Sequence, residues 1–163
     1  MKAGVSLIET LVVISIITSL SLIGINTINN FRKDAILDTI TNEFISAVRD
    51  ARSKSMNGDL LPGESTHDFS DSGLPEYGLH ITPDSYSVIR QCTRNNGTNC
   101  STDAPLITIT LDPNYIITPA VSLYFDRISG DTTGKVINLR EKNGNLGRQI
   151  NITSNFVISV TKL

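Results

Sequence analysis

Hydrophobic side chains dominate the N-terminal part of the chain. Residues 10–31 carry no Asp, Glu, Lys or Arg and are rich in Val, Leu and Ile. A helix over this stretch would extend about 33 Å at about 1.5 Å per residue. That length is enough to cross the hydrocarbon core of a bilayer, which is about 30 Å thick. The pattern therefore predicts a transmembrane helix near the N-terminus.

The apolar positions become periodic beyond this stretch. They recur at helical spacing, with charged side chains between them, at Ile36, Ile40, Phe44, Val48 and Ala51. Such spacing predicts an amphipathic helix over residues 31–57 that buries one face. Because no proline interrupts residues 5–57, a single continuous helix is allowed, with Gly24 and Asn26 as points where it could bend or unwind. Asn57-Gly58 is a suitable end for it.

The remaining part of the chain, residues 58–163, reads as a sheet domain. A loop rich in Gly, Pro, Ser and Asp comes first, and short alternating or β-branched segments follow it. We expect strands at Tyr77–Thr82, Ser85–Cys92, Leu106–Leu111, Ile116-Ile117, Val121–Arg127, Val136–Arg140, Gln149–Thr153 and Phe156–Thr161. Since no second helix is predicted, the sheet should be antiparallel, with one face packed on the amphipathic helix. The fold class is therefore α+β.

Charge and composition narrow the classes of partner. The 163 residues carry a formal net charge of −2, and the sequence pI is about 5.6. A broad electrostatic surface for nucleic acid needs a basic balance, so DNA binding is not supported by charge. Trp is absent and Tyr and Phe are few, which also argues against a stacking platform for single strands.

The start of the chain carries a distinctive motif. Lys2 is followed by Gly4, then by an apolar run in which Glu9, the fifth residue counting from Val5, is the single charge before residue 32. A buried carboxylate costs about 2.5–3.5 kcal/mol on insertion scales, so Glu9 calls for a specific partner. This string resembles the processing site of type IV prepilins and type II secretion pseudopilins. Val5 departs mildly from the Phe or Met usual in that family, and Thr10 replaces a commoner Leu.

The resemblance implies both processing and assembly. A prepilin peptidase would remove the leader peptide, residues 1–4, by cutting after Gly4, and Val5 would then be N-methylated. Residues 5–30 would form a transmembrane segment that becomes the filament core, with Glu9 acting in assembly. Two alternatives stay open. A secretory signal peptide has a shorter apolar region without an internal acid, and a simple membrane anchor explains the length but not the position of Glu9.

Three segments of the predicted soluble region extend the resemblance. Residues 47–55, 77–79 and 123–130 are similar to the H-type minor pseudopilins and the T-type minor pilins. The family implies the pilin fold and a structural, minor subunit of a type IV pilus or type II secretion pseudopilus. It implies other pilin or pseudopilin subunits and an inner-membrane assembly platform as partners. It also implies a single pass through the bacterial inner membrane, with the globular domain outside the cytoplasm, before assembly into a filament.

The two cysteines, Cys92 and Cys100, flank a polar segment rich in turn formers. If the domain is exported, an oxidising compartment makes a local disulfide between them plausible. Two unpaired thiols remain an alternative, because sequence does not fix connectivity. Metal binding is the poorer interpretation, since no second Cys or His pair accompanies them.

Residues that could carry out catalysis do not form a recognisable pattern. His67 and His80 lack metal-pair spacing, and there is no nucleophile elbow or phosphate loop. Asp68, Asp71 and Glu76 could bind Ca²⁺, but a solvated acidic loop explains them better because the ligand spacing of a calcium loop is missing. We therefore expect neither enzyme activity nor a cofactor. The alternatives to a structural subunit are a tip-located module that binds DNA, an adhesin target or a secreted substrate, and a membrane-anchored enzyme.

Overall fold

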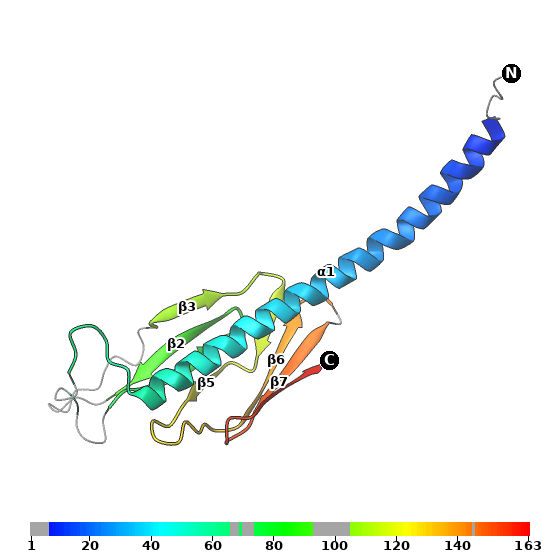
Figure 1. The fold of residues 1–163 in the computed structure, drawn as a ribbon. Coiled ribbons are helices and arrows are strands. Elements are labelled where there is room, and N and C mark those ends of the chain that lie inside the picture. Colours follow the sequence, from blue (N-terminus) through cyan, green and yellow to red (C-terminus); the bar gives the residue numbers. More distant parts are fainter. Residues whose placement is uncertain (1–6, 66–68, 70–73, 93–104, 145) are drawn as a thin grey trace. The chain divides into compact units, whose positions relative to one another are not determined.

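The computed structural model describes residues 7–65, 69, 74–92, 105–144 and 146–163; the side chains of residues 22–27 are not described. The chain divides into two compact units, Met1–Ile36 and Leu37–Leu163. One long helix, α1, runs from Leu7 to Asn57 and contributes to both units (Figure 1). The predicted helix is confirmed over these residues, and α1 passes through Gly24.

The end of α1 follows from the backbone freedom of glycine. Gly58 adopts a positive φ of 62°, a conformation that glycine reaches without steric cost. This turn lets the N–H of Gly58 donate to the carbonyl of Ser55 at 3.1 Å and the N–H of Asp59 donate to that of Lys54, also at 3.1 Å. The last carbonyls of α1 are thereby satisfied as the helix stops.

Among its described residues, the second unit also contains two antiparallel sheets (Figure 1). The first sheet has the order β3-β2-β1-β5 and consists of β1 (Glu76–Ile81), β2 (Ser85–Gln91), β3 (Ile107–Thr110) and β5 (Val121–Tyr124). The second sheet has the order β4-β6-β7-β8 and consists of β4 (Tyr115–Thr118), β6 (Lys135–Glu141), β7 (Gly147–Ile152) and β8 (Ile158–Lys162). The two sheets interleave along the chain, because β4 belongs to the second sheet and β5 returns to the first.

The predicted strands are present, and each differs from its expected bounds by one to three residues at one end or both. β5 stops at Tyr124 because the Asp126 carboxylate accepts hydrogen bonds from the N–H groups of Ile128 and Ser129, both at 2.8 Å, which turns the chain. β8 begins only at Ile158, since Phe156 has a positive φ of 57° and lies in the turn before the strand. In both places the strand is shorter than the apolar pattern in the sequence, because a local turn interrupts the extended backbone.

The core lies between the two sheets and residues 37–55 of α1. The helix contributes Leu37, Phe44, Ile45, Val48 and Ala51, and both sheets contribute Leu, Ile and Tyr side chains to the same cluster. The predicted helix face is confirmed at Phe44, Val48 and Ala51. It is wrong at Ile36, which is exposed, because the buried position at the start of this face is taken by Leu37.

Hydrogen bonds connect α1 to each of the two sheets. Near the start of the second unit, Nε of Arg148 in β7 donates to Oδ1 of Asp38 at 2.8 Å. Near the end of the helix, the Ser55 hydroxyl donates to the carbonyl of Phe125, which follows β5, and accepts from the N–H of Tyr77 in β1. The helix and the sheets of this unit are therefore held in one arrangement by directional bonds as well as by apolar packing.

Candidate assembly surface

The N-terminal part of α1 presents a continuous apolar surface, which we call the apolar segment. It consists of the large side chains that are each about half exposed or more, at Leu7, Ile8, Leu11, Val12, Val13, Ile14, Ile16, Ile17 and Leu20. They lie all around the helix rather than along one stripe. A helix that is apolar on every side is suited to complete burial by other apolar groups, and an exposed surface of this kind marks a contact site.

Hydroxyl groups within the apolar segment are already satisfied by α1 itself. The side chains of Ser15, Thr18, Ser19 and Ser21 each donate to a carbonyl three or four residues earlier, at 2.8–2.9 Å. Burying a hydroxyl costs free energy when its hydrogen bond is lost. Because these bonds lie inside the helix, a partner could cover this part of α1 without leaving the hydroxyl donors unpaired.

Residues 5–30, the expected membrane-spanning segment, are described only in part. In the part of the chain that the structure describes, no helix combines the length and the apolarity needed to cross a bilayer.

The residues of the predicted processing motif are only partly described. Gly4 and Val5 lie outside the described residues, so cleavage after Gly4 stays a prediction. Glu9 lies in the first turn of α1, where a carboxylate interacts favourably with the helix dipole, and its side chain is exposed. The Glu9 carboxylate does not form an ion pair with any described residue. Its role in assembly therefore also stays a prediction.

Only one of the two cysteines, Cys92, lies within the described residues. Cys92 is buried beside Phe69, with Leu60 and Leu74 packed against them, and it is not a free thiol. Cys100 lies outside the described residues. The Cys92–Cys100 bridge accordingly stays a prediction.

Of the polar residues that the sequence offered as ligands, the structure describes Glu76 and His80. His67, Asp68 and Asp71 are outside the described residues. Nδ1 of His80 lies 2.9 Å from the Ser122 hydroxyl on the neighbouring strand β5. Burial and the nearby Asp126 carboxylate raise the pKa of Glu76, whereas the N–H groups of Ser129 and Ile128 lower the pKa of Asp126. Within the described ranges, no three potential ligands gather as a metal site would require.

A buried arginine is the main polar residue that sequence reasoning missed. Arg148 is 2% exposed; its Nη1 donates to the carbonyl of Gly147 at 3.1 Å, and Nη2 lies 2.8 Å from Asp38 Oδ1. The signal was the alternation of Arg148 with Ile150 and Ile152, which places all three on one face of β7. The partner Asp38 lies 110 residues earlier in the chain, so the pair could not be inferred from spacing.

Comparison with known proteins supports the fold. Neither protein-family models nor curated protein sequences give a match to this chain. Among solved structures, the minor pseudopilin EpsH from the type 2 secretion system of Vibrio cholerae is similar. The similarity covers 77% of this chain and 95% of that one, with a TM-score of 0.50 and 10% sequence identity. The predicted α+β class and the pilin-like arrangement of a long N-terminal helix with antiparallel sheets are thus confirmed.

Proposed function

We propose that this chain is a structural subunit of a filament built from pilin-like subunits, of the type IV pilus or type II secretion kind. The observation that carries the proposal is the exposed apolar segment of α1, which occurs in a chain whose fold is similar to that of a minor pseudopilin. The second unit has its own buried core, whereas the apolar segment needs a partner to cover it. Filament assembly through α1 supplies such a partner in neighbouring subunits.

The energetics favour association through the apolar segment. Fully burying one Val, Leu or Ile side chain stabilises by about 1.5–3 kcal/mol relative to leaving it exposed. Several such side chains are exposed along α1, so even partial burial offsets the entropy lost on association. The partners are other pilin or pseudopilin subunits, and a prepilin peptidase and an assembly platform would act before the filament forms.

A charge placed in the apolar segment should remove the chain from filaments. In the Ile14→Asp variant, a carboxylate would be buried without a partner, at a cost of about 3 kcal/mol or more, which corresponds to about a hundredfold in affinity. We expect its share in sheared filaments, measured by immunoblot against the total cellular amount, to fall to about a tenth of wild type or less.

Two matched variants control this experiment. Ile14→Val keeps the site apolar, and Asn42→Asp places a carboxylate on an exposed part of α1 outside the apolar segment; both should enter filaments normally. If Ile14→Asp enters filaments as well as these controls do, the apolar segment is not the assembly surface and the proposed function fails.

Glu9 is proposed to select the stagger between neighbouring subunits. After cleavage, Val5 would carry a positive amine, and the Glu9 carboxylate of a neighbour would pair with it. An unpaired buried charge costs about 3–5 kcal/mol, so subunits in the wrong register would be disfavoured. The competing interpretation is that Glu9 only stabilises the first turn of α1.

Replacing Glu9 by leucine separates these interpretations. We expect Glu9→Leu to leave processing intact, so that mass spectrometry finds a mature chain beginning at Val5 with one added methyl group, and to lower the share of the chain in filaments severalfold. Normal incorporation of Glu9→Leu would show that the carboxylate has no role in assembly. An intact Met1 in the wild-type protein would refute the processing.

A further inference from the structure

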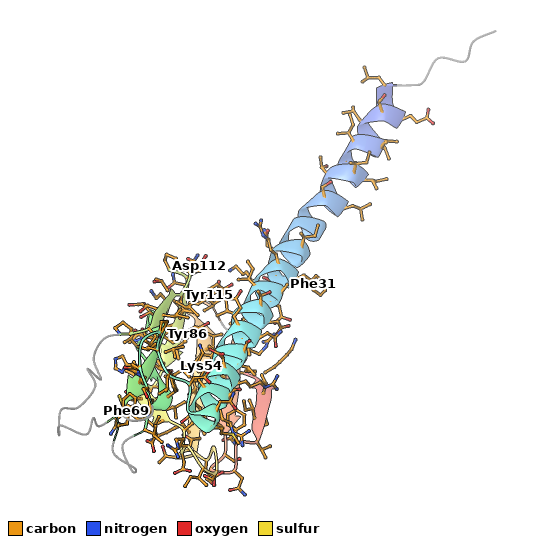
Figure 2. The ribbon with its side chains drawn as sticks, turned by 60° about the vertical axis from the view of Figure 1, so that its left-hand side comes forward. Phe31, Lys54, Phe69, Tyr86, Asp112 and Tyr115 are labelled. Atoms are coloured by element: carbon orange, nitrogen blue, oxygen red, sulfur yellow. The ribbon has the colours of Figure 1, made fainter. Side chains whose placement is uncertain are left out.

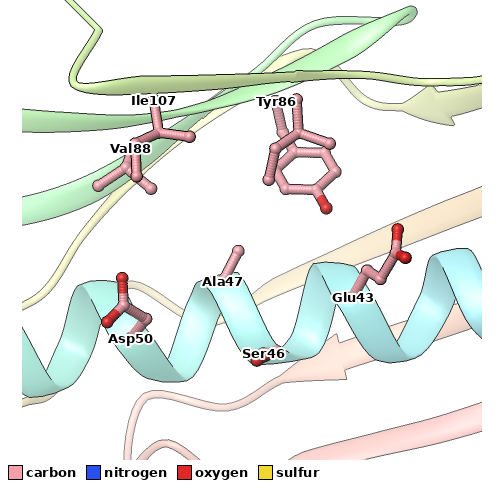
Figure 3. A pocket seen from close by; sticks show the side chains of 8 residues that line it. Glu43, Ser46, Ala47, Asp50, Tyr86, Val88 and Ile107 are labelled. Carbon is pink, nitrogen blue, oxygen red and sulfur yellow. The ribbon is translucent and has the colours of Figure 1, made fainter.

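A groove runs between α1 and the edge of the first sheet, within the second unit (Figure 3). Its volume is about 560 Å³. The helix lines it with Glu43, Ser46, Ala47 and Asp50, and the sheet lines it with Tyr86, Val88, Ile107 and Ile109. Because Ala47 is small, its side chain leaves the space between the helix and β2 unfilled, as Figure 3 shows.

The strand register explains why the sheet side of the groove is apolar. Among the described strands, β3 is an edge strand that pairs only with β2, with Ile107 opposite Val88 and Ile109 opposite Tyr86. Paired residues in an antiparallel sheet point to the same face. All four side chains therefore face α1, and Ile107 at the sheet edge is left 51% exposed.

The groove holds a buried hydroxyl group and, beside it, an exposed carboxylate. The Tyr86 side chain is 1% exposed, yet its hydroxyl has no hydrogen-bond partner among the described residues. Figure 3 shows this hydroxyl directed toward the helix between Ala47 and Glu43. Burial and the Glu43 carboxylate raise the pKa of Tyr86 to about 12. Asp50, at the other end of the groove, pairs with Lys54 at 2.7 Å. An occupant that brings a hydrogen-bond donor and a positive charge would satisfy Tyr86 and Glu43 together.

One turn of α1 itself carries the complementary chemistry. Ile28 and Phe31 are large, apolar and exposed, Phe31 by 72% (Figure 2), and Arg32 beside them is exposed as well. Residues three and four apart in a helix lie on the same face, so Ile28, Phe31 and Arg32 form one apolar and basic patch. This patch matches the groove in both apolarity and charge.

We propose that the groove binds the Ile28–Arg32 turn of α1 from a second copy of the chain. Phe31 enters the apolar space next to Ile107, while Arg32 pairs with Glu43 and donates a hydrogen bond to the Tyr86 hydroxyl. This contact rests on the proposed filament function and gives it a specific lateral interface. It uses a surface distinct from the apolar segment, residues 7–20.

Site-specific photocrosslinking of the full-length chain tests this contact. The photoreactive residue p-benzoylphenylalanine would replace Ile107 in cells that assemble filaments, and irradiated filaments would be digested with trypsin and analysed by mass spectrometry. The expected product joins the residue 107 peptide to the peptide of a second copy that ends at Arg32. Crosslinks only to other proteins, only to other segments, or to nothing would overturn the proposal.

Charge reversal supplies the specificity control. Glu43→Arg and Arg32→Glu should each lower the yield of the crosslink about fivefold or more, since an attraction becomes a repulsion. In chains with Arg32→Glu, the crosslinked tryptic peptide ends at Lys33 in place of Arg32. The double variant should restore the yield, whereas Arg49→Glu, on an exposed position of α1 outside the groove lining, should leave it unchanged. A double variant as weak as the single ones would overturn the pairing.

Measuring filament content in the same cells separates the two proposals. If the crosslink is absent while the chain still enters filaments, the groove contact fails and the filament function stands. If Ile14→Asp enters filaments normally, the filament function fails whatever the crosslink shows.

Discussion

Phe44→Ala is expected to destabilise the second unit by about 3–5 kcal/mol, the usual cost of deleting a fully buried aromatic side chain. Phe44 is completely buried. Its ring meets that of Tyr86 edge to face, with centroids 5.2 Å apart, so the substitution removes both the packing of the helix on β2 and a favourable aromatic pair. The loss should also loosen the side of the groove that Tyr86 lines.

Urea denaturation of the full-length chain measures this effect. The chain has no Trp, and its four Tyr residues lie in the second unit at Tyr77, Tyr86, Tyr115 and Tyr124, so tyrosine fluorescence reports on that unit alone. Phe44→Leu, which keeps most of the volume, should cost less than about 1.5 kcal/mol, and Asn42→Ala on the exposed side should be close to neutral. Equal midpoints for Phe44→Ala and Asn42→Ala would contradict the packing described for α1.

Asp38→Ala should destabilise the same unit by about 3 kcal/mol, and more than Arg148→Met does. Removing Asp38 takes away the carboxylate that two nitrogens of the buried Arg148 contact at 2.8 Å. Leaving a buried charge without its counter-ion costs about 3–5 kcal/mol; we expect the lower end because the Asp38 side chain is half exposed and water can replace it in part. Arg148→Met removes the charge and its need for a partner together.

The order of these two variants is the informative result. Urea midpoints followed by tyrosine fluorescence would give both free energies of unfolding, and the double variant would give their coupling. If Arg148→Met is the more destabilising of the two, the guanidinium contributes net stability. The attraction between Arg148 and Asp38 would then exceed the free-energy cost of removing the two charges from water.

The elements of the fold could be predicted because their signals are local. The helix follows from an unbroken run without proline and the strands from alternation, and both are present close to the expected positions. Pairing could not be predicted in the same way. The division into two sheets depends on β5 leaving β4 to join β1, a choice between distant strands whose alternation is alike.

The two candidate surfaces differ in how far the sequence revealed them. The apolar segment of α1 is contiguous, so composition alone identifies it. The groove combines Glu43 with Ile107 and Ile109, residues far apart in the chain that are brought together only by the fold. Nothing local to Glu43 distinguishes it from the solvated charges on the same helix, such as Arg49.

The interleaving of the two sheets affects how the chain can fold during synthesis, when its N-terminus appears first. β1, β2 and β3 can pair as soon as they appear, and β5 completes their sheet. β4 appears before β5 but pairs with β6, so it must stay unpaired while the first sheet closes. Non-local pairing of this kind slows folding and leaves an edge open to wrong partners. A chain released after β5 would hold a complete first sheet and an orphan strand, so the second unit can become cooperative only once β6 and its neighbours have arrived.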